Sequence, residues 1–263
     1  SLLCTEKTDV LRLACEKFNT GDARFIQFEK DGNYKDFAVF MTIKAMHKYE
    51  PWNLWSEKYR TYSEDLEKEI IKNYQRDYLF WVWTQFEFLD EWNELHAYAK
   101  EKEIEIMGDM PLYVAYDSVE VWKYPELFVL DEAHGPKLVA GCPPDCFTAD
   151  GQLWGNPIYD WEYMRKTNYS WWNERIKKAF ALFDILRIDH FRGFAQYYTI
   201  PAGMPNARIG EWVDGPKFDL FKDKTEFRIV AEDLGFIDDH VRTLLRQTSY
   251  PGMKVLEFAF DGS

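Results

Sequence analysis

The sequence has few cysteines, and it lacks both a long apolar run and a secretory leader pattern. Its 263 residues hold four cysteines, Cys4, Cys15, Cys142 and Cys146, too few to predict a disulfide framework in a chain of this size. No stretch approaches the roughly 20 apolar residues that a membrane helix needs. The first residues do not show the charged, apolar and small-residue order of a signal peptide. These absences predict a reduced, cytoplasmic protein.

Positive charge is also scarce. The chain has 32 lysines and arginines against 45 acidic residues, a net charge of −13. A phosphate backbone or an anionic membrane surface requires a basic face. The charge balance therefore predicts neither nucleic acid nor membrane as a partner.

Aromatic residues are abundant, at 18% of the chain. Rings of this kind fill cores and helix contacts, and they also stack on the apolar faces of sugars. Composition alone leaves both interpretations open for any single ring.

Glycine and proline are absent between residues 61 and 102. This segment predicts one very long helix or two abutting ones, with a capping box at Thr61 and Glu64. The segment 78–83 is so apolar that we expect it to be buried on more than one side. A segment rich in Pro, Gly and Asp, about 117–160, is expected to be irregular, and so is the stretch holding Gly203, Gly210 and Gly215.

The second half alternates strand and helix patterns. Apolar strand patterns at 104–111, 185–189, 227–232 and 253–260 are separated by helical patterns near 170–183 and 238–247. This order is typical of a parallel α/β sheet or barrel. Three acids end these strands: Asp109, Asp189 and Glu232. Barrel enzymes keep their catalytic groups at the carboxyl ends of strands.

The strand at 185–189 places Arg187 and Asp189 on one face, because side chains alternate along a strand. An arginine beside Asp189 keeps that carboxylate charged and available as a nucleophile. If Glu232 faces the same pocket and holds a proton, the pair is suited to a retaining glycosyl transfer. The alternatives are an internal salt bridge for Arg187 and Asp189, and a solvated strand end for Glu232.

Cys142 and Cys146 are separated by three residues, which raises the question of a metal site. The intervening Pro143-Pro144 and the lack of paired histidines argue against zinc. We therefore expect no metal.

Several segments resemble the amylomaltase, or 4-α-glucanotransferase, family of the α-amylase superfamily. The resemblance covers essentially the whole chain. The segments that carry it are Arg187-Ile188-Asp189-His190-Phe191-Arg192-Gly193-Phe194, Ala231-Glu232-Asp233-Leu234-Gly235, Met107-Gly108-Asp109-Met110-Pro111-Leu112-Tyr113, Gly151-Gln152-Leu153-Trp154-Gly155-Asn156-Pro157, Pro251-Gly252-Met253-Lys254-Val255-Leu256 and Pro51-Trp52-Asn53-Leu54-Trp55.

The resemblance implies an α/β fold, a partial (β/α)₈ TIM barrel with a helical insertion subdomain. Residues 1–75 would form the helical subdomain, and 76–263 the partial catalytic barrel, with a substrate loop at about 135–160. The implied activity is retaining transfer of α-1,4-glucan segments between maltooligosaccharides, or glucans derived from starch or glycogen, without cofactor or metal. Asp189 would be the nucleophile and Glu232 the acid/base. The implied substrate contacts are Arg187, Asp109, His190, Trp154, Phe147 and Asn156.

The chain departs from the family pattern in two respects. The family's third acid lies in a Thr-His-Asp-Asn type segment, and this chain holds no His-Asp dipeptide. About four of the eight barrel strands are recognisable, so we expect a fragment lacking the first strands and the last third of the barrel. Exposed strand edges would favour self-association. A glucan-binding fragment without turnover and an α-glucan hydrolase remain the alternative functions.

Overall fold

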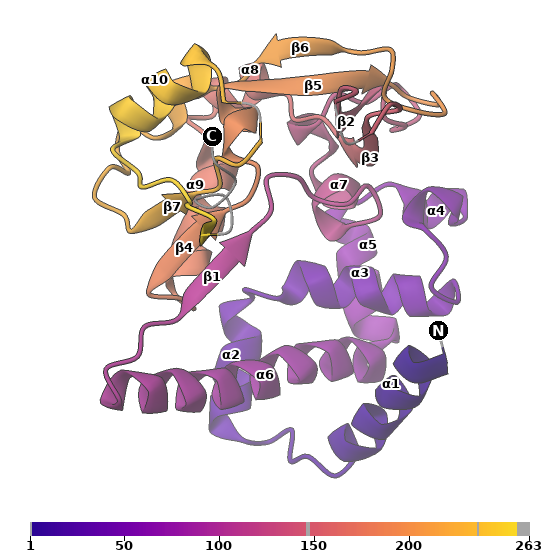
Figure 1. Cartoon of the computed structure of the whole chain (residues 1–263). Helices are drawn as coiled ribbons and strands as arrows, with labels where there is room; N and C mark the ends of the chain where they lie inside the picture. Colours follow the sequence, from indigo (N-terminus) through magenta and orange to yellow (C-terminus); the bar gives the residue numbers. More distant parts are fainter. Residues whose placement is uncertain (1, 146–147, 236, 257–263) are drawn as a thin grey trace. The chain divides into compact units, whose positions relative to one another are not determined.

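The computed structural model describes residues 2–145, 148–235 and 237–256 (Figure 1). Two compact units divide the chain, one formed by Ser1–Tyr98 with Asp117–Tyr124, the other by Ala99–Tyr116 with Pro125–Ser263. The boundary expected at residue 75 coincides with the start of a helix, α6, that the first unit holds almost to its end. The functional division into 1–75 and 76–263 stays a prediction.

The first unit is built from helices. They are α1 (Leu2–Cys15), α2 (Ala23–Asp31), α3 (Lys35–Met46), η1 (Trp52–Leu54), α4 (Glu57–Arg60), α5 (Glu64–Asn73), α6 (Gln75–Glu101) and α7 (Val119–Lys123). The segment without glycine and proline thus forms two abutting helices, α5 and α6, rather than the single long helix that was the other expectation. The expected capping box is wrong, because Ser63 rather than Thr61 caps α5, accepting a bond from the Leu66 N–H at 3.1 Å.

Aromatic rings form the core of this unit. Phe40, Trp55 and Trp122 bring their ring centroids within 5.3–6.1 Å of one another. Tyr78 and Phe80 on α6 are each 2% exposed, which confirms that this part of the helix is buried. Packing therefore accounts for these rings.

A parallel sheet organises the second unit. Strands β1 (Met107–Met110), β4 (Ile185–Ile188) and β7 (Ile229–Ala231) lie side by side in the order β1-β4-β7, both pairs parallel (Figure 1). The helical segments of this unit are η2 (Pro125–Leu127), α8 (Trp161–Lys166), α9 (Ser170–Phe180), η3 (Phe191–Phe194), η4 (Lys217–Leu220) and α10 (Asp239–Thr248). The α/β class with a parallel sheet is confirmed.

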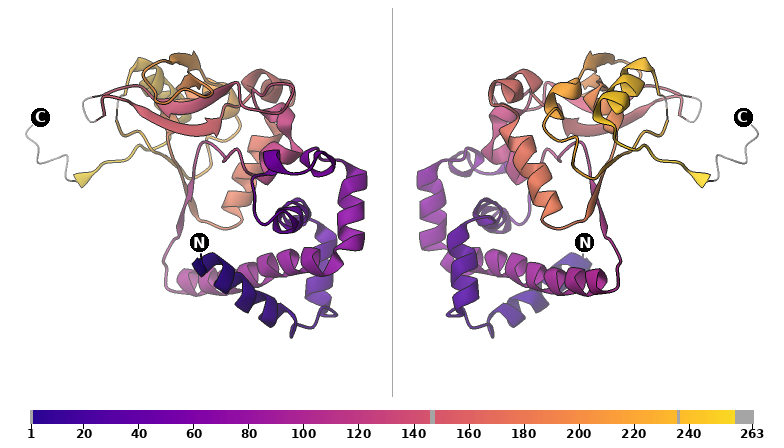
Figure 2. Two further views of the ribbon diagram at one scale, coloured as in Figure 1. Left: turned by 90° about the vertical axis from the view of Figure 1, so that its right-hand side faces the viewer. Right: turned by 90° about the vertical axis from the view of Figure 1, so that its left-hand side faces the viewer.

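A second sheet occupies segments that were expected to be irregular, so that expectation is wrong. Strands β2 (Leu138–Cys142), β3 (Gln152–Pro157), β5 (Gln196–Pro201) and β6 (Glu211–Asp214) form an antiparallel sheet in the order β3-β2-β5-β6 (Figure 2). Gly141 permits this pairing, since a Cβ there would lie 2.1 Å from the Gln152 carbonyl oxygen.

The strand expected at 253–260 is represented by an isolated parallel bridge between Ala231 and Gly252. Residues 253–256 do not form a strand, and the remainder of that segment lies outside the described residues. Within the described ranges, the helices are all too short or too polar to traverse a lipid bilayer.

Candidate active site

Strand register brings Asp109 and Arg187 together. Asp109 on β1 is the direct partner of Arg187 on β4. The guanidinium donates to the Asp109 Oδ1 at 2.6 Å and to the Asp189 Oδ1 at 2.9 Å. One arginine thus joins two carboxylates from neighbouring strands. Burial by itself would lower the pKa of Arg187, but the bonds and charges of Asp109 and Asp189 outweigh it and raise that pKa.

Glu232 lies at the end of the next strand. Its backbone N–H donates to the Ile188 carbonyl at 3.0 Å, and the Asp189 N–H donates to the Met110 carbonyl at 3.0 Å. The ladder therefore continues past the strands and sets both acids at the carboxyl edge of the sheet. The Glu232 carboxylate accepts the His190 N–H at 2.9 Å and the Leu234 N–H at 2.8 Å.

His190 joins the two acids. It follows Asp189 directly, and its backbone is in the left-handed region, with a φ of 52°. Desolvation by burial, with a smaller contribution from the nearby Arg192 charge, lowers the pKa of the imidazole to about 4. Its buried Nε2 has no hydrogen-bond partner among the residues that the structure describes. At neutral pH this nitrogen belongs to an uncharged ring that can exchange a hydrogen bond with a hydroxyl group.

An exposed indole stands over this histidine. Trp154 on β3 meets the His190 ring edge to face, with ring centroids 4.8 Å apart, and is 37% exposed. The contact sets β3 next to the end of β4. The Trp154 Nε1 donates to the Gln152 Oε1 at 3.0 Å, which fixes the ring.

The two remaining residues expected to bind substrate are placed differently. The Asn156 amide donates to the Val114 carbonyl at 2.9 Å, so its nitrogen already serves to anchor β3. Phe147 lies outside the described residues. The structure therefore brings together Asp109, Arg187, Asp189, His190, Trp154 and Glu232.

Two residues of this region received no role from the sequence. Tyr113 lies beside Trp154, with ring centroids 6.3 Å apart, and desolvation raises its pKa well above the ordinary value. Arg192 is 6% exposed and donates to Asp238 at 3.2 Å, with its guanidinium 4.0 Å from the Trp212 ring centroid. The one sequence feature that could have identified these two residues is their position. Tyr113 follows β1 closely, and Arg192 lies three residues after Asp189.

No group of three or more His, Cys, Asp or Glu side chains is arranged to hold a metal within residues 2–145, 148–235 and 237–256. Cys146 lies outside those ranges. Cys142 is a free thiol, and burial raises its pKa to about 11, so it is protonated at neutral pH.

This combination defines a class of protein. A parallel α/β sheet presents two carboxylates at adjacent strand ends, one paired with arginine, and an exposed indole lies beside them. Carboxylate pairs of this kind perform glycosyl chemistry, and barrel-type enzymes place them at this edge of the sheet. The arrangement resembles that of barrel-type enzymes that act on glycosidic bonds.

Comparison with known proteins gives the particular family. A family model described as 4-alpha-glucanotransferase matches residues 1–263. A 4-alpha-glucanotransferase of Clostridium butyricum is 42% identical over 99% of this chain and 55% of its own length. One of Streptococcus pneumoniae serotype 4 is 44% identical over 93% of this chain and 50% of its own length. The chain belongs to the 4-alpha-glucanotransferase family.

Solved structures agree with this assignment. An amylomaltase from Streptococcus agalactiae, solved in complex with acarbose, superposes with a TM-score of 0.92 at 37% identity, over 98% of this chain and 54% of that one. An amylomaltase from Corynebacterium glutamicum shares the fold, with a TM-score of 0.76 at 19% identity, over 98% of this chain and 35% of that one. The chain spans about half the length of the relatives it matches.

Proposed function

We propose that this chain carries the nucleophile and the acid/base of a retaining 4-alpha-glucanotransferase, which moves α-1,4-glucan segments between maltooligosaccharides. The observation that carries the proposal is the bridge from Arg187 to Asp109 and Asp189, directly beside the Glu232 carboxylate. The proposed catalytic part is 76–263, and 1–75 is the proposed helical subdomain. The two free cysteines of the described residues support a reduced, cytoplasmic setting.

In the first step, an Asp189 oxygen attacks the anomeric carbon of the donor glucan and forms a glycosyl ester. The bond to the departing oxygen breaks, and Glu232 transfers its proton to that oxygen. Arg187 donates to the Asp189 Oδ1 at 2.9 Å and thereby directs the carboxylate. In the described structure each Glu232 oxygen accepts one backbone N–H group, which leaves a second lone pair on each oxygen for the proton that Glu232 transfers.

In the second step, the 4-hydroxyl of an acceptor glucan attacks the ester carbon. Glu232, now a carboxylate, accepts the hydroxyl proton, the ester bond breaks, and Asp189 is restored as a carboxylate. The configuration at the anomeric carbon is inverted twice and therefore retained. The enzyme ends the cycle with the proton distribution it had at the start.

Neighbouring side chains are proposed to bind the sugar. The exposed ring of Trp154 offers a flat apolar face to a pyranose unit. The uncharged His190 and the Asp109 carboxylate offer hydrogen bonds to hydroxyl groups. Phe147 and Asn156 complete the proposed contacts by resemblance to the family.

The transferase is favoured over the two alternatives, a hydrolase and a binding fragment without turnover. The matched relatives are described as 4-alpha-glucanotransferases. The chain spans about half of these relatives' length, and the maltotriose assay measures whether it transfers glucan by itself.

The test is incubation of the chain with maltotriose and chromatography of the products. Transfer predicts glucose together with a ladder of longer maltooligosaccharides. Asp189→Asn should abolish the ladder, with a loss of at least about 10⁴-fold, since removal of a nucleophile stops the first step. Glucose and maltose without longer products would indicate hydrolysis and contradict the proposal.

A further inference from the structure

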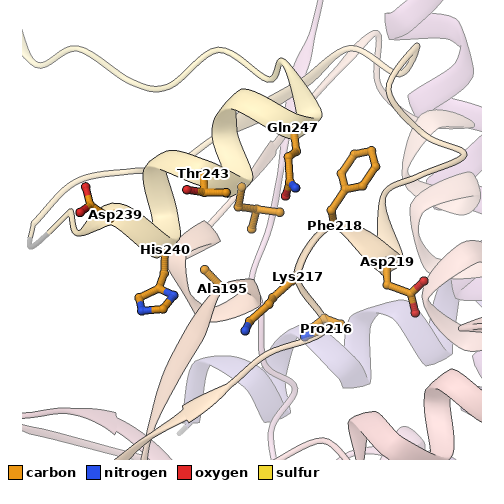
Figure 3. Close-up of a pocket in the computed structure, with 10 residues that line it drawn as sticks. Ala195, Pro216, Lys217, Phe218, Asp219, Asp239, His240, Thr243 and Gln247 are labelled. Atoms are coloured by element: carbon orange, nitrogen blue, oxygen red, sulfur yellow. The ribbon is translucent and has the colours of Figure 1, made fainter.

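A pocket separate from the candidate active site opens between α10 and η4 (Figure 3). Its volume is about 600 Å³, within the range of small-molecule sites. Its lining includes Ala195, Phe218, His240, Thr243, Leu244 and Gln247. The side of α10 turned toward η4 is therefore not packed against it over its full length.

The helix face that lines this pocket is unusually polar. His240, Thr243, Leu244 and Gln247 are spaced by three and four residues, so they share one side of α10. A helix face turned toward a neighbouring element is ordinarily apolar. Here Leu244 is buried, whereas the other three are exposed and carry an imidazole, a hydroxyl and an amide. Each of these groups exchanges hydrogen bonds with neutral hydroxyl groups.

Apolar groups also contribute to the lining of the pocket. Phe218 and Pro216 contribute from η4 and its N-cap, and the buried Ala195 follows η3. An apolar surface beside hydrogen-bonding groups matches a pyranose, which has C–H faces and a hydroxyl rim. Lys217, with a φ of 56°, holds this turn in the left-handed region that L-residues rarely adopt.

The charges at the pocket are largely compensated. Lys217 pairs with Asp214 at 2.6 Å, and Asp219 pairs with Arg165 and with Lys222, each at 3.5 Å. Asp239 adds a negative charge at the rim. An anionic ligand such as a phosphate would find a neutralised lysine and nearby carboxylates, so the pocket favours an uncharged ligand.

We infer that this pocket is a second glucan-binding site, which takes an uncharged maltooligosaccharide segment. Phe218 contacts the pyranose C–H faces, and Thr243 and Gln247 hydrogen-bond to its hydroxyl groups. The choice of a maltooligosaccharide as the ligand rests on the proposed function, whereas the existence of the pocket does not depend on it. Ala195 lies five residues after His190, so one short segment links the pocket to the candidate active site.

The test uses the 263-residue chain with maltoheptaose as the probe, followed by hydrogen–deuterium exchange of the α10 amides and by titration calorimetry. Maltoheptaose should slow exchange over 239–248. The double variant Thr243→Ala/Gln247→Ala should lose this protection, and its affinity at the pocket should fall about tenfold or more, because two hydrogen-bonding groups are removed. Both residues are exposed, so circular dichroism should match the parent chain.

Two controls make the outcome specific. Arg242→Ala alters the opposite face of α10 and should keep the protection. Trp154→Ala, at the candidate active site, should also keep it. Absence of protection in the parent chain, or equal protection in the double variant, overturns the second site.

The maltotriose assay separates this inference from the proposed function. Protection of α10 in a chain without transfer would leave the pocket standing and count against the function. Transfer without protection of α10 would support the proposed function and overturn the second glucan-binding site.

Discussion

Arg187 donates to two carboxylates, Asp109 on β1 and Asp189 directly after β4. Its guanidinium donates through separate nitrogens, at 2.6 and 2.9 Å. A lysine ammonium carries the same charge but is a single point with flexible donors. The proposed role of Arg187 therefore depends on geometry as well as on charge.

We predict that Arg187→Lys lowers kcat for maltotriose transfer roughly 10–100-fold, because Asp189 keeps a nearby charge but loses its fixed orientation. The measurement is the initial rate of product formation. Arg228→Lys is the matched control, since Arg228 also binds one carboxylate, Glu105, through two nitrogens, but at the start of β7. Equal losses in both variants would indicate a general effect on stability and contradict the proposed role.

His190 makes stability depend on pH. Burial lowers its pKa from the ordinary 6.5 to about 4. Between these values the unfolded chain binds a proton at this residue that the folded chain does not bind. The stability that the neutral ring contributes is therefore lost as the pH falls through this window.

We predict that His190→Gln reduces this dependence. Between about pH 7 and pH 4.5 the parent chain should lose roughly 1–3 kcal/mol more unfolding free energy than the variant. Urea unfolding at both pH values measures the difference. His134, which also has a positive φ but is only half-buried, serves as the control position through His134→Gln. A pH dependence unchanged by His190→Gln would show that the buried imidazole is not its source.

At the scale of elements, the sequence predicted the buried parallel strands well. β4 and β7 have continuous apolar patterns that are each followed by an acid, and this pattern identified Asp189 and Glu232 as candidate site residues. The antiparallel sheet was missed, because β2 and β3 each contain a glycine and lie within the segment rich in Pro, Gly and Asp, where a loop separates them. Its pairing is set by long-range contacts such as Gly141 with Tyr198. Tyr113 and Arg192 were missed for the same reason, since their neighbours come from distant segments.

Asp238 connects two elements. Its carboxylate caps α10 by accepting the His240 and Val241 N–H groups at 3.0 and 3.1 Å, and it also pairs with the buried Arg192. We predict that Asp238→Asn, which keeps a capping oxygen but loses the ion pair, costs roughly 1–3 kcal/mol, and that Asp238→Ala costs about 1 kcal/mol more. Urea unfolding distinguishes the two.

The neighbouring exposed Asp239 supplies the control for this series. Asp239→Asn should change stability by less than about 0.5 kcal/mol. If Asp238→Asn and Asp238→Ala were equally destabilising, the cap would contribute nothing, and the ion pair alone would matter.

At the scale of the whole molecule, an open sheet edge competes with charge repulsion. Among the described residues β1 pairs with β4 alone, and Met107 on β1 is 51% exposed. An unpaired edge with exposed apolar side chains favours association with a second copy. A net charge of −13 opposes it, and salt weakens this repulsion because the Debye length falls from about 10 Å at 0.1 M to about 3 Å at 1 M.

We therefore predict concentration-dependent self-association that strengthens as salt is added. Sedimentation velocity at low and high ionic strength measures it. Met107→Lys places a charge on the edge strand and should shift the chain toward monomer, whereas Lys178→Met on the exposed side of α9 should leave association unchanged. If charge repulsion rather than the sheet edge governed the equilibrium, both substitutions would act through the net charge alone. Lys178→Met makes the chain more negative and would then increase the fraction of monomer. Met107→Lys makes the chain less negative and would decrease that fraction. The two explanations thus predict opposite signs for Met107→Lys, and the observed sign decides between them.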